Sequence, residues 1–146
     1  MTAEYSDTLR EVRRPSEIAG KSVFNPYAAG VHLLTALHGR DPDYRFSDEE
    51  TVNEARERAQ MVLNHLAARP ESHLVVVSHE MFIKTLLEAM TIASDARGMT
   101  TYRLFRPFLI LRNASITECV WDGAWHIASI NDTNHLRSQD LSLVPR

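Results

Sequence analysis

His79 is the residue whose position most directly suggests chemistry, because it stands between two apolar patterns of different period. Residues 74–77, Leu-Val-Val-Val, form a continuous apolar run that predicts a strand buried on both faces of a parallel sheet. From Phe82 to Met90 apolar residues recur at helical spacing, which predicts a helix over residues 81–90. Ligands of open α/β sheets bind outside the carboxyl ends of the strands, where a helix N-terminus offers N–H groups to an anion. The stretch therefore predicts an anion-binding site at His79.

The residue types around His79 leave more than one interpretation open. From position alone, His79 fits a site histidine and an ordinary packed or exposed histidine equally well. As a carboxylate, Glu80 would oppose a phosphate dianion, yet an acidic residue in the first turn of a helix is favourable by about 0.3–1 kcal/mol. The cluster of Arg10, Arg13 and Arg14 is typical of a solvated face, and it could also attract a phosphate.

Four stretches of the chain follow one another in an informative order. In chain order they are LREVRRPSEIAGKS (9–22), FSDEETVNEARERAQMVLNHLA (46–67), Ser-His-Glu (78–80) and RNASITECVWDGAWHIASINDTNHL (112–136). The third lies between the predicted strand and the predicted helix. This series resembles the histidine phosphatase superfamily, the phosphoglycerate mutase-like proteins. Those proteins have an acidic segment, a Glu-rich helix with an arginine, a Ser-His-Gly motif and a closing hairpin that ends in Asn-x-Thr-x-His-Leu. Here Glu80 stands in place of the glycine.

The resemblance implies a role for four residues. His79 would be the second histidine of the family, which stabilises charge on the phosphate, and Glu11 matches the acidic residue that protonates the leaving oxygen. Phosphate binding is implied for His79, for the backbone amide of Glu80 and for Arg14, with the amide of residue 81 as a further donor. Without the resemblance, Glu11 is one solvated glutamate among several. Neither a cofactor nor a metal is implied.

The resemblance also implies a fold: one α/β domain over residues 1–146, built as a three-layer sandwich with a mainly parallel sheet. The nucleophile of the family is a histidine in an Arg-His-Gly motif on the first strand, and no Arg-His-Gly occurs in the 146 residues. Met1 precedes Glu11 by only a few residues. The chain therefore resembles the C-terminal part of such a protein, with a fold that is expected to be incomplete at the N-terminus.

Two functions follow as hypotheses. The first is a phosphoric monoester hydrolase or phosphoglycerate mutase-like protein for a small phosphorylated metabolite, impaired or inactive because the nucleophilic histidine is missing, so that enzyme activity is an open question. The alternative is a non-catalytic phosphate-binding or protein-interaction module. Loss of the first strand would leave an open sheet edge, which predicts a homo-oligomer or a partner chain paired along that edge.

Composition excludes several other classes of protein. With 16 basic and 19 acidic residues, the chain has no cationic surface of the kind that nucleic acid requires. No apolar run approaches the roughly 20 residues that span a bilayer, and the N-terminus lacks the apolar core of a signal peptide. Cys119 is the only cysteine, which rules out an internal disulfide and a Cys-x-x-Cys metal or redox motif. A cytoplasmic protein is expected.

The remaining elements are predicted from local signals. Residues 1–24 are expected to be irregular, and Asn25-Pro26 begins a helix that Gly39 ends, with Tyr27, Val31, Leu34 and Leu37 on its apolar side. Ser47 and Glu50 fit a capping box for a second helix that runs to Pro70, with Glu54 and Arg58 paired on its outer face. A loop that could contain one helical turn is expected from residue 91, and a bent edge strand is expected over residues 102–111. Asp122-Gly123 predicts a hairpin of residues 114–121 and 125–130, with Trp121 and Trp125 as packing residues.

Overall fold

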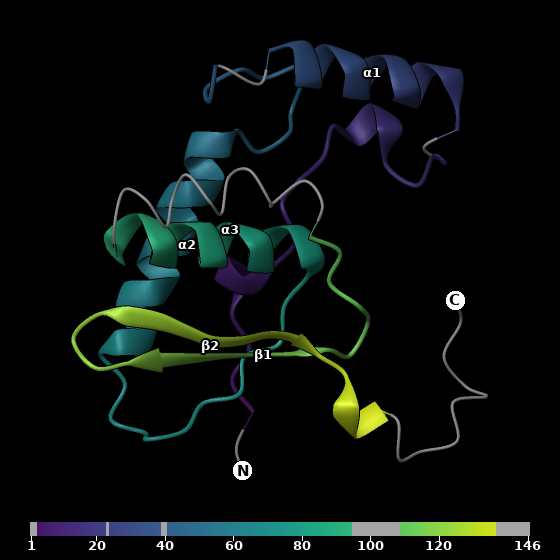
Figure 1. Cartoon of the computed structure of the whole chain (residues 1–146). Helices are drawn as coiled ribbons and strands as arrows, with labels where there is room; N and C mark the ends of the chain where they lie inside the picture. The colour runs from purple at the N-terminus through teal and green to yellow at the C-terminus, as the bar shows by residue number, and fades with distance from the viewer. Residues whose placement is uncertain (1–2, 23, 39–40, 95–108, 137–146) are drawn as a thin grey trace. The chain divides into compact units, whose positions relative to one another are not determined.

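The computed structural model describes residues 3–22, 24–38, 41–94 and 109–136. The chain divides into two compact units, Met1–Leu86 and Leu87–Arg146. In the described residues of the first unit, the short 3-10 helices η1 (Asp7–Leu9) and η2 (Ser16–Ile18) precede the helices α1 (Pro26–Leu37) and α2 (Val52–Ala67). Helix α3 (Glu80–Ser94) begins in the first unit and ends in the second, which then holds strands β1 (Ile116–Trp121) and β2 (Trp125–Asp132) and the turn η4 (Asn134–Leu136) (Figure 1). The prediction of one domain over the whole chain stays a prediction.

Helix α1 begins where the sequence predicts. The side-chain oxygen of Asn25 accepts hydrogen bonds from the amides of Tyr27 (3.0 Å) and Ala28 (3.2 Å), so it caps the first turn. Its buried face differs from the predicted one: Ala28 and Val31 are buried against Ile18, whereas the predicted Tyr27, Leu34 and Leu37 are exposed. The difference arises because η2 provides the packing surface for α1, and η2 contacts only one narrow side of it.

The predicted capping box of helix α2 is wrong by one turn. Thr51 is the N-cap, and its hydroxyl accepts from the amide of Glu54 (3.2 Å) while the Glu54 carboxylate accepts from the amide of Thr51 (2.9 Å). Both Ser47-x-x-Glu50 and Thr51-x-x-Glu54 satisfy the capping pattern. The first pair is not used because the Ser47 amide donates to Glu49 and the Glu50 carboxylate is bound by Arg58.

The predicted outward pair of Glu54 and Arg58 is also wrong. Arg58 is only 5% exposed and binds Glu50, while Glu54 pairs with Arg45. Four apolar residues of α2 face inward and are buried: Ala55, Ala59, Val62 and Leu63. Arg58 therefore lies among the buried residues of α2.

Residues 74–77 do not form the buried strand that the sequence predicts. They lie outside any strand, and Val75 and Val77 are 78% and 81% exposed, because no described strand lies beside them. The described residues contain one sheet, the antiparallel pair β1-β2. The mixture of helices and strands agrees with an α/β fold, and the mainly parallel sheet stays a prediction.

Helix α3 contains the predicted 81–90 helix and is longer. It begins at Glu80 and continues to Ser94, so residues 91–94 extend the helix by about one turn. Phe82 and Leu87 are fully buried, and Lys84, Thr85 and Glu88 are buried as well. Helix α3 is thus enclosed over much of its circumference, beyond the single apolar face that the sequence pattern predicts.

The C-terminal hairpin is confirmed. Strands β1 and β2 pair in antiparallel fashion around Asp122-Gly123, and Gly123 has a φ of +106°, a conformation that favours glycine. Trp121 lies opposite Trp125, with their ring centroids 5.3 Å apart, so the two rings pack across the end of the hairpin as predicted. Most of the predicted loop and edge strand, residues 95–108, lies outside the described residues.

Candidate functional site at the start of helix α3

The carboxylate of Glu11 lies at the N-terminus of helix α3. One oxygen accepts hydrogen bonds from the amides of Phe82 (3.0 Å) and Val12 (2.8 Å), and the other accepts from the amide of Met81 (3.3 Å). The first amides of a helix have no partner within the helix and carry its positive dipole end, so a carboxylate there is stabilised. Two residues that are 71 positions apart in the sequence are thereby joined.

His79 precedes helix α3 and belongs to the same corner. Its carbonyl accepts the first helical hydrogen bond, from the amide of Ile83 at 2.8 Å. Its imidazole is exposed, and no hydrogen bond or ion pair joins it to another residue in the described ranges. On its N-terminal side, the hydroxyl of Ser78 donates to the carbonyl of Leu9 at 2.7 Å. The corner therefore presents the His79 ring to solvent beside the segment that carries Glu11.

A buried ion pair holds that segment from the other side. The guanidinium of Arg58 donates from Nε and Nη2 to the two carboxylate oxygens of Glu50, at 2.7 and 2.6 Å, and both side chains are 6% exposed. Its Nη1 donates to the carbonyls of Thr8 (2.8 Å) and Arg10 (3.0 Å). The same group lies over the ring of Phe82, 3.8 Å from the centroid. Arg58 thus contacts both the Glu11 segment and the start of α3.

The charge of Glu50 is held by this pair. Burial alone raises the pKa of Glu50, but the hydrogen bonds and positive charge of Arg58, with a hydrogen bond from the Arg13 amide and the charge of Arg10, outweigh it. The net result is that the pKa of Glu50 is lowered. A carboxylate whose charged form is favoured in the fold remains paired with Arg58 at neutral pH.

The other two predicted phosphate-binding positions are placed differently. The Glu80 side chain pairs with Lys84 (2.6 Å) one turn along α3, while the Glu80 amide donates no hydrogen bond to a described residue. Arg14 is exposed and makes no ion pair with the described part of the chain. It lies three residues after Glu11, which limits the separation of their Cα atoms to about 11 Å. The structure brings Glu11 to the start of α3 beside His79 and leaves Arg14 on the surface.

Sequence reasoning did not identify Arg58, Glu50 or Ser78 as part of the site. One signal could have revealed Arg58. On a helix, residue 58 shares a face with residues 55, 59 and 62, and all three of these are apolar. A charged residue on an apolar helix face must be paired when buried.

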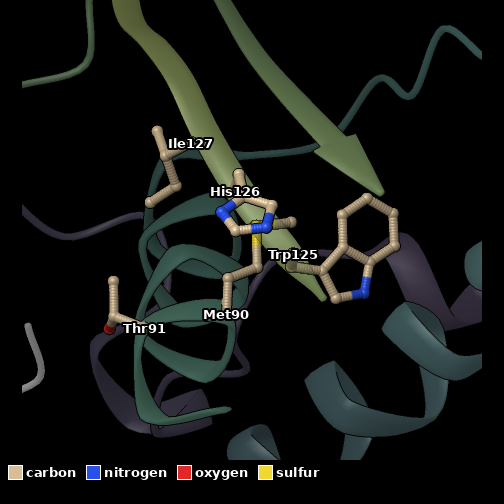
Figure 2. A pocket seen from close by; sticks show the side chains of 5 residues that line it. All are labelled: Met90, Thr91, Trp125, His126 and Ile127. Atoms are coloured by element: carbon tan, nitrogen blue, oxygen red, sulfur yellow. The ribbon is translucent and has the colours of Figure 1, made fainter. Parts of the chain in front are cut away.

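A separate hollow lies within the second unit. Figure 2 shows Met90 and Thr91 of α3 with Trp125, His126 and Ile127 of β2 around a space of about 190 Å³. The His126 imidazole is 3.0 Å from a carboxylate oxygen of Asp122, and both side chains are largely exposed. None of the predicted site residues lines this hollow.

Metal and thiol chemistry find no support in the described residues. No group of three or more His, Cys, Asp or Glu side chains is close enough there to hold a metal ion. Burial, with a smaller contribution from the charge of Glu118, raises the pKa of the Cys119 thiol, which makes the thiol a weak nucleophile. Among the described helices, none has the length and apolar character needed to cross a membrane.

Comparison with protein families agrees with the order of the four sequence stretches. The model of the family described as "Histidine phosphatase superfamily (branch 1)" matches residues 1–133. Comparisons with curated proteins and with solved structures gave no match. The matched range includes the Glu11 segment, helix α2 and the Ser78-His79 corner. The resemblance is therefore confirmed, and the chain belongs to the histidine phosphatase superfamily.

Proposed function

We propose that this chain binds a phosphate monoester at the start of α3 and serves as a phosphoric monoester hydrolase or phosphoglycerate mutase-like protein of small phosphorylated metabolites. The observation that carries the proposal is the contact of Glu11 with the amides of Met81 and Phe82, directly after His79. An acid and a potential cation from distant parts of the sequence then border one helix N-terminus. That arrangement suits phosphoryl chemistry, which depends on positioning and on stabilisation of charge.

His79 is the proposed phosphate ligand. Its exposed imidazole has no competing partner among the described residues, and in its protonated form it would donate a charge-assisted hydrogen bond to a phosphate oxygen. The Glu80 amide, which donates to no described residue, would add a neutral donor, and the exposed side chain of Arg14 would add a positive charge. The Glu80 carboxylate, paired with Lys84, repels the phosphate less than an unpaired carboxylate would.

Glu11 is the proposed proton donor. A general acid must lie within hydrogen-bond reach of the leaving oxygen, and its orientation must be fixed. The amides of Met81 and Phe82 fix the carboxyl group at the start of α3, so a phosphate held by His79 would present its ester oxygen near it. In this scheme the protonated form of Glu11 would deliver the proton to the leaving oxygen, and His79 would stabilise charge on the transferred group.

The nucleophile is the missing part of this scheme. The 146 residues contain no Arg-His-Gly, the motif that carries the nucleophilic histidine in the superfamily. We therefore propose binding with little or no turnover by this chain alone. We also propose the mainly parallel three-layer sandwich as its fold type.

Phosphate affinity tests this proposal. Binding of inorganic phosphate, measured by titration of the His79 ring signals in NMR, should weaken about tenfold or more in His79→Ala, the loss expected for a charge-assisted hydrogen bond. His73→Ala is the matched control, because His73 is also exposed and bonds only to the hydroxyl of Ser72. Since the reporter ring is absent from His79→Ala, the Met81 and Phe82 amide signals serve for both proteins. Equal affinity in the two variants would overturn the proposal.

Hydrolysis of an aryl phosphate tests the proposed lack of turnover. We expect no turnover above the uncatalysed rate. Turnover that disappears in His79→Ala would mean that another group attacks phosphorus, and the proposed silence of the chain would be wrong.

A second candidate, a protein-interaction module, is favoured by one observation. Residues 74–77 expose apolar side chains, and their backbone makes no hydrogen bond to any described residue. A β-branched segment with unpaired backbone groups is suited to strand addition. In this alternative, the partner is a second copy of the chain, paired through the same residues.

A further inference from the structure

We propose that Arg58, held by Glu50, is the residue that positions Glu11. Its functional meaning rests on the proposed role of Glu11 as proton donor, whereas the structural coupling can be tested without any substrate. Arg58 lies on α2 and touches neither the carboxylate of Glu11 nor the imidazole of His79. It acts on the site through the main chain and through Phe82.

The first support is that four of the five N–H donors of the guanidinium are engaged in a fixed orientation. Two nitrogens bind both carboxylate oxygens of Glu50, at 2.7 and 2.6 Å, and the third binds two carbonyl oxygens, at 2.8 and 3.0 Å. The residue is 5% exposed, so water does not compete for these donors. A planar group with four such bonds cannot rotate without losing several of them at once.

The second support is where the carbonyl partners lie. The two carbonyls belong to Thr8 and Arg10, and Arg10 immediately precedes Glu11. Glu50 continues the restraint on the other side of Glu11, because its amide donates to the carbonyl of Arg13 at 3.0 Å and its carboxylate accepts from the Arg13 amide at 3.4 Å. The backbone is thereby fixed both before and after Glu11.

The third support is the contact with Phe82. The guanidinium of Arg58 lies 3.8 Å from the centroid of the Phe82 ring. The amide of Phe82 makes the shorter of the two hydrogen bonds from α3 to Glu11, 3.0 Å against 3.3 Å for Met81. Arg58 therefore contacts Arg10, which precedes Glu11, and Phe82, whose amide Glu11 binds. A single side chain sets the separation between the two partners of the Glu11–Phe82 hydrogen bond.

A lysine could not replace this arginine. An ammonium group has no planar face to stack on Phe82 and no fork to bind the Glu50 carboxylate on two edges while it reaches two carbonyls. Arg58→Lys keeps the charge and most of the length of the side chain. It therefore separates a requirement for positive charge from a requirement for this geometry.

Hydrogen exchange of single backbone amides tests the proposal in the full chain. In Arg58→Met and Arg58→Lys, the amides of Met81 and Phe82 should exchange about tenfold faster or more, because both lose a correctly placed acceptor. The amides of Val62 and Leu63, buried on α2, should stay within about twofold of their original rates. Glu50→Gln serves if Arg58→Met does not fold, and it should give the same selective pattern.

The matched control is Arg69→Gln. Arg69 also donates from two nitrogens to the two oxygens of one carboxylate, that of Glu71, at 3.1 and 2.9 Å. Its third nitrogen binds Glu4, and Arg69 does not contact the Glu11 segment. It should leave the exchange of Met81 and Phe82 unchanged. Faster exchange at all four reporter amides in Arg58→Lys would mean that Arg58 only stabilises the fold, and unchanged exchange at Met81 and Phe82 would also overturn the proposal.

The two proposals fail separately. If the unmodified chain does not bind phosphate, the proposed function falls, while the exchange pattern still decides whether Arg58 positions Glu11. If phosphate binds through His79 but Met81 and Phe82 remain protected in Arg58→Lys and Glu50→Gln, the positioning role alone falls.

Discussion

Glu11 should stabilise the fold as a helix cap, independently of any catalytic role. In Glu11→Ala the amides of Met81 and Phe82 lose their acceptor. Loss of an N-terminal cap costs about 0.5–2 kcal/mol, and loss of a negative charge at a helix N-terminus costs about 0.3–1 kcal/mol. The two effects share the same carboxylate and do not add fully. We expect the free energy of unfolding to fall by about 1–2 kcal/mol.

Urea unfolding followed by circular dichroism measures this change. With a urea dependence of about 2 kcal/mol per molar, the middle of the usual range, the midpoint should fall by roughly 0.5–1 M without a change in slope. Glu11→Gln keeps an acceptor oxygen and should lose less. Glu57→Ala is the control, because Glu57 is exposed on α2 and makes no ion pair with the described residues; it should change stability by less than about 0.5 kcal/mol.

A particular result would refute this reasoning. If Glu11→Ala and Glu57→Ala unfold at the same urea concentration, the Glu11 carboxylate is not bound to α3 in solution. The geometry on which the proposed site is built would then be wrong, whatever the affinity of His79 for phosphate.

Three further predictions concern Glu50, Phe82 and residues 74–77. The pKa of Glu50 in the folded protein lies below its ordinary value of 4.5. The stabilisation that Glu50 gives the fold is therefore complete above pH 4.5 and is lost as the pH falls through the folded pKa. Glu50→Gln should flatten the loss of stability below pH 4.5 in urea titrations, and an acid profile equal to that of the unmodified chain would contradict this prediction. Phe82→Ala should lower the free energy of unfolding by about 3–5 kcal/mol, since Phe82 is fully buried. Phe24→Ala, at a 90% exposed position, should lower it by far less, and equal thermal midpoints of the two variants would contradict this prediction. In sedimentation the chain should form a dimer as its concentration rises, and Val75→Lys should prevent this while Leu37→Lys does not; a monodisperse monomer at high concentration would count against self-association.

Features that depend on neighbouring residues were predictable from the sequence. Asn25-Pro26 begins α1, and Asp122-Gly123 turns the hairpin, because each signal is a backbone preference that acts within a few residues. The capping box of α2 shows the limit of such signals. Two consecutive pairs fit the pattern, and the choice between them depends on Arg58, which binds the Glu50 carboxylate.

Features that depend on distant residues were predictable only in part. The run of residues 74–77 has the composition of a buried strand, but burial requires neighbouring strands, and none is described there. Glu11 and His79 were identified through family resemblance and not through spacing. The inward position of Arg58 depends on carbonyl and carboxylate partners far from it in sequence, which a helical pattern read by itself does not specify.

The bonds of the segment around Glu11 span 37 to 71 positions of the sequence, from Arg13–Glu50 to Glu11–Phe82. Contacts of such large separation are late in folding, because loop-closure entropy must be overcome before they form. During synthesis, this segment leaves the ribosome well before the start of α3 exists. The Glu11 carboxylate has no α3 amide to bind until about 70 more residues have been added, a delay of several seconds at ordinary elongation rates. The site is therefore completed among the last steps of folding. A chain interrupted before Phe82 would contain Glu11 but would lack the Phe82 amide that its carboxylate binds.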